Sequence, residues 1–273
     1  MKFLFPLLAV LVSTNVLAAD FTVQLTPAAG SVGNTEVSSI LSTKISDWST
    51  AFASLFASTI KGPTQQVFRT PTGSTPLTYT KPAGVLYIRV VMVGAGGGGC
   101  GSGTSAGSLA TAGGQTVFGS VLTANGGGAG GFNVDGGLGG SSTIGAGATG
   151  ISLSGGQGAG SPSANNNYQN VPGGIGGASA FGGAGNSNYN RAGYSAAAYT
   201  GSGGGGGGTY NQTSGNAGAG GGAGGYVNAI ILNPLPSYTF LVGGGGPGGG
   251  NGPGGAAGGA GAGGFIEVTE YYQ

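Results

Sequence analysis

The spacing of hydrophobic residues changes along the chain, and it first predicts a helix. Between residues 35 and 61 apolar side chains recur every three or four positions, which is typical of an amphipathic helix. The recurring positions are Val37, Leu41, Ile45, Trp48, Phe52 and Leu55. Asn34 or Thr35 suits the N-cap, and Lys61-Gly62-Pro63 is a typical helix end. The apolar face of this helix has nearly the spacing of a heptad repeat. It is expected either to pack against the rest of its own domain or to join copies of the chain as a homo-oligomer through residues 35–61.

After residue 79 the apolar runs become short and predict strands. Residues 84–93 are mostly apolar and β-branched at odd and even positions alike, which indicates a strand buried on both faces. Four later runs have the composition of strands: Val117–Thr123, Tyr226–Leu232, Tyr238–Val242 and Phe265–Tyr272. The Pro-containing turn 233–237 is expected to join two of them as a hairpin. Residues 79–273 are therefore expected to be mainly β, with a small sheet core.

The first 19 residues have the composition of a secretory signal. Lys2 precedes an apolar run from Phe3 to Val12, and small residues near Ala18 fit a cleavage site. The run is shorter than the ~20 residues that a spanning helix needs, so we expect export without stable membrane insertion. The protein would then be secreted or extracellular, in a periplasm or at a cell surface, or part of a virion if phage-encoded.

These patterns divide the chain into four parts. Residues 1–19 form the signal, 20–62 a helical segment for attachment or oligomerisation, and 63–78 a Thr- and Pro-rich connector. The remaining part, 79–273, is a glycine-rich β module.

Composition excludes most chemistry from this module. The chain has 69 Gly and no His, and all but five of the Gly lie between Gly94 and Gly264. Asp135 and Arg191 are the only charged residues in that stretch. We therefore expect no catalytic residues, no metal or cofactor site and no enzyme activity. A formal net charge of +1 gives no basic surface for nucleic acid. The single Cys, Cys100, is expected to be a buried filler, a free thiol or an intermolecular link.

Four structures could account for the glycine tracts: a flexible linker, a nucleotide-binding loop, low-complexity filler, or an ordered array of polyproline-II-like helices. Gly94–Gly99 matches G-x-G-x-x-G after a strand, but no helical pattern follows and the next acid is Asp135, so the match arises by chance. Regular apolar inserts weaken the linker interpretation. Gly occupies every third position from 243 to 264, and again from 215 to 224. Three residues per turn is the period of polyproline II, in which only Gly allows close approach of neighbouring helices.

Both ends of this region resemble a known family. Residues 79–85 (YTKPAGV) and 88–99 (IRVVMVGAGGGG) are similar to the opening of the glycine-rich C-terminal domain of phage tail-fibre proteins, and residues 241–246 (LVGGGG) and 264–272 (GFIEVTEYY) are similar to its end. More loosely, the region resembles the tail-fibre tip adhesins of T-even-like phages. That resemblance implies stacked polyglycine helices whose loops bind bacterial surface receptors. A signal peptide and an N-terminal helix in place of a fibre shaft depart from the family.

If the glycine tracts are a scaffold, recognition falls to the loops between them. Tyr and Asn are typical of adaptable binding loops, and they equally suit glycans, since Tyr offers rigid amphipathic area and Asn both donates and accepts. Arg191 is the only cation among the tracts. The residues expected to bind are Tyr168, Asn188, Tyr189, Arg191, Tyr194, Tyr199 and Tyr210. The same composition also fits ordinary polar turns.

The sequence thus predicts a non-enzymatic receptor-recognition protein, an adhesin or tail-fibre-like module, that binds a cell-surface protein or glycan. The alternative is an extracellular matrix or coat protein that assembles through its glycine tracts. An ice-binding role would need a flat face of Thr or Ala, which the spacing does not provide.

Overall fold

The structure is a computed structural model, and it describes residues 61–73, 75–161, 170–209 and 215–272. The chain divides into two compact units, Met1–Thr59 and Ile60–Gln273, and every described residue belongs to the second. The predicted signal and almost all of the predicted helix lie outside the described residues.

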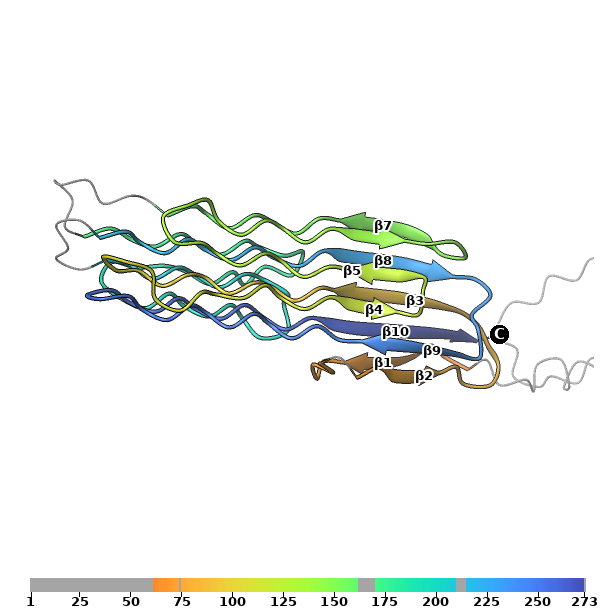
Figure 1. Cartoon of the computed structure of the whole chain (residues 1–273). Coiled ribbons are helices and arrows are strands. Elements are labelled where there is room, and N and C mark those ends of the chain that lie inside the picture. The colour runs from red at the N-terminus through yellow and green to blue at the C-terminus, as the bar shows by residue number, and fades with distance from the viewer. Residues whose placement is uncertain (1–60, 74, 162–169, 210–214, 273) are drawn as a thin grey trace, which may run out of the picture. The chain divides into compact units, whose positions relative to one another are not determined.

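The described part is mainly β, as predicted, with two antiparallel sheets of five strands (Figure 1). We call them sheet A, ordered β1-β10-β3-β8-β7, and sheet B, ordered β2-β9-β4-β5-β6. The strands are β1 (Thr64–Phe68), β2 (Leu77–Thr80), β3 (Val85–Val93), β4 (Thr116–Phe118), β5 (Leu122–Ala124), β6 (Ser142–Ile144), β7 (Thr149–Leu153), β8 (Tyr226–Ile231), β9 (Ser237–Leu241) and β10 (Phe265–Tyr272). No helix occurs in this described part of the chain.

The hydrophobic core lies between the two sheets. Strand β3 contributes Ile88, Val90 and Met92, which alternate along the strand and are fully buried. Sheet B faces them with side chains that include Phe118 and Phe240. This alternation places one face of each sheet in a shared apolar layer.

Three predictions about the strands need correction. Residues 117–123 form two short strands and not one, because Gly119 adopts a φ of +57° and turns the chain after β4. Residues 233–237 do not close a hairpin, since β8 pairs with β3 and β7 whereas β9 pairs with β2 and β4. The segment therefore carries the chain from sheet A to sheet B. Strand β3 is buried on both faces only toward its end, and Leu86 is 50% exposed.

The structure also contains strands that the apolar pattern did not predict. Strand β1 and the first half of β2 lie within the Thr- and Pro-rich connector, and β6 and β7 lie among glycine tracts. Their sequences are short and polar, such as TQQVF in β1 and TGISL in β7. All four have exposed or half-exposed positions because they lie at or near sheet edges.

Most strands continue directly into glycine-rich tracts (Figure 1). The tract 94–102, which follows β3, lies among the others and is hydrogen-bonded on all sides. Its N–H groups donate to backbone carbonyls at 2.8–3.1 Å, and every third N–H donates to the same neighbouring segment. Gly94, Gly97 and Cys100 donate to residues 219–225, and Ala95 and Gly98 donate to residues 111–114. Gly96, Gly99 and Ser102 donate to residues 256–262. Its carbonyl groups accept from three further segments, 127–130, 204–207 and 246–252. One tract thus contacts six neighbours through its backbone alone.

The glycines at every third position lie where tracts approach each other most closely. A Cβ on any of the eight positions from Gly243 to Gly264 would lie 1.8–2.7 Å from a backbone oxygen of residues 93–114. For every three residues forward from Gly243, the contacted oxygen lies three residues earlier in the segment 93–114, so the two segments run in opposite directions. Gly218, Gly221 and Gly224 meet Cys100, Gly97 and Gly94 in the same way, at 1.9–2.1 Å. No side chain fits at these distances, so the period reflects contact between backbones.

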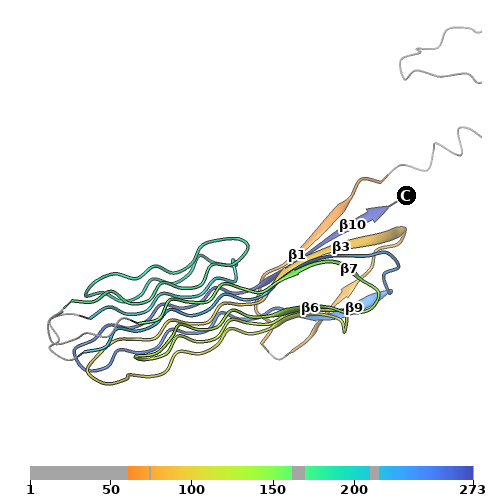
Figure 2. The same ribbon diagram turned by 90° about the horizontal axis from the view of Figure 1, so that it is seen from above.

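Four tracts within residues 171–209 are not direct continuations of strands. They lie on the same side as sheet A (Figure 2). Their turns alternate between the two ends of the tracts. The turns 178–182 and 198–201 lie next to sheet A, where Phe181 contacts Phe265 and Tyr226. The turn 188–191 lies at the far end, where the carbonyl of Arg191 accepts from the N–H of Gly208. We call these the proximal turns and the distal turn.

Candidate functional site

The structure divides the predicted binding residues between the two ends of the tracts. Asn188, Tyr189 and Arg191 belong to the distal turn, and Tyr194 follows it on the returning tract. Tyr199 belongs to a proximal turn, beside Arg69. Tyr168 and Tyr210 lie outside the described residues. The predicted set is therefore not a single site.

The distal turn presents exposed polar and aromatic side chains on a fixed backbone. Asn188, Tyr189 and Arg191 are all exposed, and Tyr189 retains 58% of its surface. Asn190 adopts a φ of +53°, a conformation that Asn tolerates better than most residues. The Asn188 side chain accepts a hydrogen bond of 2.8 Å from the N–H of Tyr189. The side chains are thus free to meet a partner while the turn itself is held.

Tyr194 shows how the backbone of the returning tract is anchored. Its N–H donates to the carbonyl of Asn186 at 2.9 Å, and its own carbonyl accepts from Gly205 at 3.0 Å. Tyr194 is nevertheless 50% exposed. Tyr194 therefore extends the exposed surface of the distal turn along its tract.

The two proximal turns place Tyr199 and Phe181 at the end of sheet A where β8 and β10 begin. Hydroxyl groups join the two turns: Ser179 Oγ donates to the carbonyl of Thr200 at 2.5 Å, and the buried Ser202 Oγ donates to the carbonyl of Gly182. Tyr199 adopts a φ of +59°, which is rare for an aromatic residue and marks a backbone that its surroundings constrain. The backbone that carries the two rings is therefore constrained, and the Phe181 ring also packs on Phe265 and Tyr226.

A pocket of about 360 Å³ lies beneath these turns. Small-molecule sites commonly have volumes of ~300–1,000 Å³. The lining residues are Arg69, Phe181, Ala198, Tyr199, Thr200, Phe265 and Glu267. Arg69 stands over the Tyr199 ring at 5.9 Å from its centroid, a cation–π arrangement. Phe181 packs edge-on against Phe265, with centroids 5.0 Å apart. We call this the proximal pocket.

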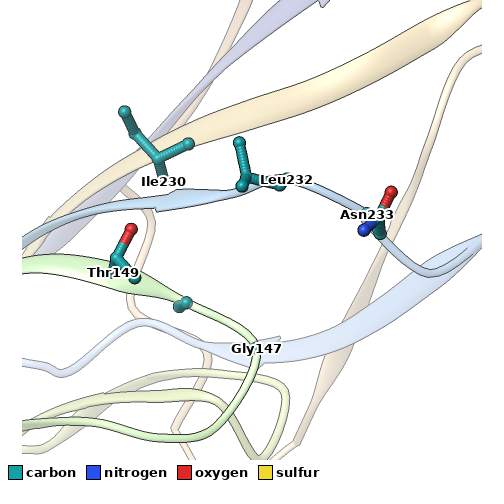
Figure 3. A pocket seen from close by; sticks show the side chains of 6 residues that line it. Gly147, Thr149, Ile230, Leu232 and Asn233 are labelled. Atoms are coloured by element: carbon teal, nitrogen blue, oxygen red, sulfur yellow. The ribbon is translucent and has the colours of Figure 1, made fainter.

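A second pocket, between β7 and the end of β8, is more apolar (Figure 3). Ile230 and Leu232 come from β8 and its end, whereas Thr149 begins β7. Leu232 is 64% exposed. The pocket has no charged lining residue, so it offers less directional chemistry than the proximal pocket.

The buried carboxylate of Glu270 and the buried hydroxyl of Tyr79 form a separate cluster between the sheets. Glu270 is 1% exposed and accepts hydrogen bonds from Gln66 Nε2 at 2.6 Å and from Tyr79 Oη at 3.0 Å, as well as from Thr64 Oγ1. Burial, together with the hydrogen bond to the Glu270 carboxylate, raises the pKa of Tyr79 far above its ordinary value. The cluster is enclosed by protein, so it serves the fold and does not face a ligand.

Cys100 is a free thiol and is buried, with 2% of its surface exposed. Burial raises the pKa of this thiol. The interpretation of Cys100 as a buried filler is the one that its surroundings support.

Within the described ranges, no group of three or more His, Cys, Asp or Glu side chains could hold a metal ion. The same part of the chain contains no helix long and apolar enough to cross a membrane. No family model matches this chain, and no curated protein or solved structure matches it significantly either.

Sequence reasoning identified Tyr199 but missed its neighbours in the proximal pocket. Arg69 lies in the segment interpreted as a connector, and Phe265 and Glu267 lie on the last strand. These residues are far apart in sequence and show no common motif. Phe181 is one of the apolar inserts between Gly tracts, and nothing in the pattern distinguishes it from the others. An aromatic residue flanked by Ser179, Gly182 and Gly183 was nevertheless a signal for an exposed ring on a tight turn.

Proposed function

We propose that the protein is a non-enzymatic recognition module that binds a cell-surface protein or glycan through the distal turn. The observation that carries the proposal is the combination of exposed Tyr189 and Arg191 with a backbone anchored on the tracts. Rigid presentation lowers the entropic cost of binding, and Tyr and Arg are the residue types that most often dominate binding energy.

In this proposal the tracts are polyglycine-II helices that act as the scaffold. The tract 94–102 forms hydrogen bonds to six neighbouring segments, and these bonds repeat every three residues. This pattern supports the assignment, because a helix with three residues per turn and no internal hydrogen bonds must satisfy its N–H and C=O groups externally. Close backbone contacts at the Gly positions support it further. Such a scaffold would hold the turns with little freedom to move.

Assembly into a matrix or coat is the second candidate, and one observation favours it. Leu109, Leu138 and Ile175 lie on different tracts and are 74%, 70% and 51% exposed. Apolar side chains on the outside of a bundle could pack between copies of the chain. This candidate predicts large assemblies in sedimentation, whereas a recognition module would sediment as a monomer or small oligomer, such as one joined through residues 35–61.

The test uses the fluorescently labelled full chain and a panel of bacterial cells, read by flow cytometry. A variant carrying Asn188→Ser, Tyr189→Ser and Arg191→Ser is expected to lose at least tenfold in cell binding with an unchanged circular dichroism spectrum. Leu235→Ser, an exposed position in the segment that joins β8 to β9, is the control. Undiminished binding by the triple variant would refute the assignment of recognition to the distal turn.

A further inference from the structure

The proximal pocket combines features that suit a ligand different in kind from a protein surface. Two aromatic rings, Phe181 and Tyr199, are 44% and 46% exposed and enter the pocket from two turns. A carboxylate, Glu267, and a guanidinium, Arg69, line the same space. The ligand must therefore offer both an apolar face and polar groups.

The two charged groups set complementary requirements. An ionised carboxylate only accepts hydrogen bonds, and a guanidinium only donates them. No ion pair joins Arg69 and Glu267 among the described residues, and Arg69 instead contacts the Tyr199 ring. A ligand whose neighbouring groups each donate and accept can satisfy both side chains at once. Vicinal hydroxyl groups have that property.

From this arrangement we infer that the proximal pocket binds a neutral saccharide unit. The C–H face of a pyranose ring packs on Phe181 or Tyr199, and its hydroxyl groups donate to Glu267 and accept from Arg69. The volume of about 360 Å³ accommodates a small ligand of this kind. The site is distinct from the distal turn, so it does not rest on the function proposed above.

The pocket is also organised before any ligand arrives. Hydroxyl groups of Ser179 and Ser202 join the two turns, and Phe181 packs against both Phe265 and Tyr226. A saccharide would therefore meet a Phe181 ring that is already ordered, which lowers the entropic cost of binding a small ligand.

The experiment titrates the full chain with the methyl glycosides of glucose, galactose, mannose and N-acetylglucosamine, and follows ligand saturation-transfer NMR and isothermal calorimetry. At least one glycoside is expected to bind. Phe181→Ala and Glu267→Gln are each expected to raise its Kd tenfold or more, while Asp135→Asn, which removes an exposed charge outside the pocket, leaves the Kd unchanged. Glu267→Gln keeps the shape of the side chain, so it tests the pocket even if Phe181→Ala disturbs folding.

Three results would overturn the inference. The first is that none of the glycosides binds, and the second is that binding survives both pocket substitutions. The third is that the pocket binds only a free amino acid such as phenylalanine, which is titrated in the same way. In that case Arg69 would bind the carboxylate of the ligand and Glu267 would bind its ammonium group. The pocket substitutions leave the distal turn intact and the readout is glycoside binding, so failure here is distinguishable from failure of the proposed cell recognition, which is tested by the distal-turn variant on cells.

Discussion

Tyr79 on β2 donates a hydrogen bond of 3.0 Å to the carboxylate of Glu270 on β10, and this contact joins sheet B to sheet A. Both side chains are 1% exposed. A buried carboxylate is costly unless donors surround it, and the other donors to Glu270 are Thr64 and Gln66 of β1 and the hydroxyl of Tyr272 on β10. The polar residues of β1 and β2 thus explain why two short strands with little apolar character belong to the sheets.

Removal of this hydroxyl should cost stability at neutral pH. Tyr79→Phe keeps the ring but deprives Glu270 of a donor, and hydrogen bonds to charged groups contribute about 1.5–3 kcal/mol. We expect a loss of about 2 kcal/mol in the free energy of unfolding, measured by urea denaturation. Tyr87→Phe, in which the ring still stacks on Tyr271, is the control and should change stability by less than about 0.5 kcal/mol. Equal effects of the two substitutions would contradict the role of the Glu270 contact.

The same contact predicts how stability changes with alkaline pH. The pKa of Tyr79 is raised in the folded protein above the ordinary 10.0, so the native state holds this proton more tightly than the unfolded chain does. Its contribution is complete below pH 10 and is lost as pH rises from 10 toward the folded pKa. The free energy of unfolding should therefore fall from pH 10 to 11.5 more steeply in the wild type than in Tyr79→Phe. Parallel curves would show that Tyr79 titrates normally.

A pair of glycines in one tract tests the close packing of the backbone. A Cβ on Gly261 would lie 2.1 Å from the carbonyl oxygen of Gly96, whereas a Cβ on Gly263 would have no neighbour nearer than 3.7 Å. Gly261→Ala should destabilise the protein by about 3 kcal/mol or more, because backbone must move. Gly263→Ala should be neutral or stabilise by about 0.4–1 kcal/mol, since it restricts the unfolded chain. Chemical denaturation of both variants measures the difference, and similar values would argue against packed tracts.

The sequence predicted the β class and the glycine period because each depends on local pattern. Strand β3 is an almost continuous apolar run, and β10 carries Ile266 and Val268 at alternate positions, so both were visible as strands and both fill the core. The spacing of three from Gly243 to Gly264 corresponds to one face of a tract against residues 93–114. A repeat of this kind can be read from residues alone because every third position has the same steric requirement.

Pairing between distant segments could not be read in the same way. Whether residues 233–237 close a hairpin or cross between sheets depends on the partners of β8 and β9, which lie elsewhere in the chain. The proximal pocket depends likewise on Arg69, Tyr199 and Glu267 meeting across three separate segments. The Tyr- and Asn-rich composition identified plausible loops but not the end of the tracts at which each loop lies.

Cys100 should resist thiol reagents for as long as the protein is folded. The thiolate is the reactive species, and burial both raises the pKa of this thiol and blocks access to it. With 5,5′-dithiobis(2-nitrobenzoate) at pH 8, we expect no labelling of the native protein within minutes and complete labelling in 6 M guanidinium. Rapid labelling of the native protein would show that the tract 94–102 opens readily.

The junction between strand and tract at Thr116 provides the last prediction. Where β9 ends, the sheet offers no carbonyl to the N–H of Gly243, and this N–H donates instead to the buried hydroxyl of Thr116 at 3.1 Å. Thr116→Val has nearly the same shape but leaves the N–H without an acceptor, which should cost about 1–3 kcal/mol. Thr116→Ser keeps the hydroxyl and loses only a methyl group, worth about 0.8 kcal/mol. Urea denaturation should therefore rank the serine variant as the more stable. The opposite order would mean that filling the space at this junction matters more than satisfying the first N–H of the tract.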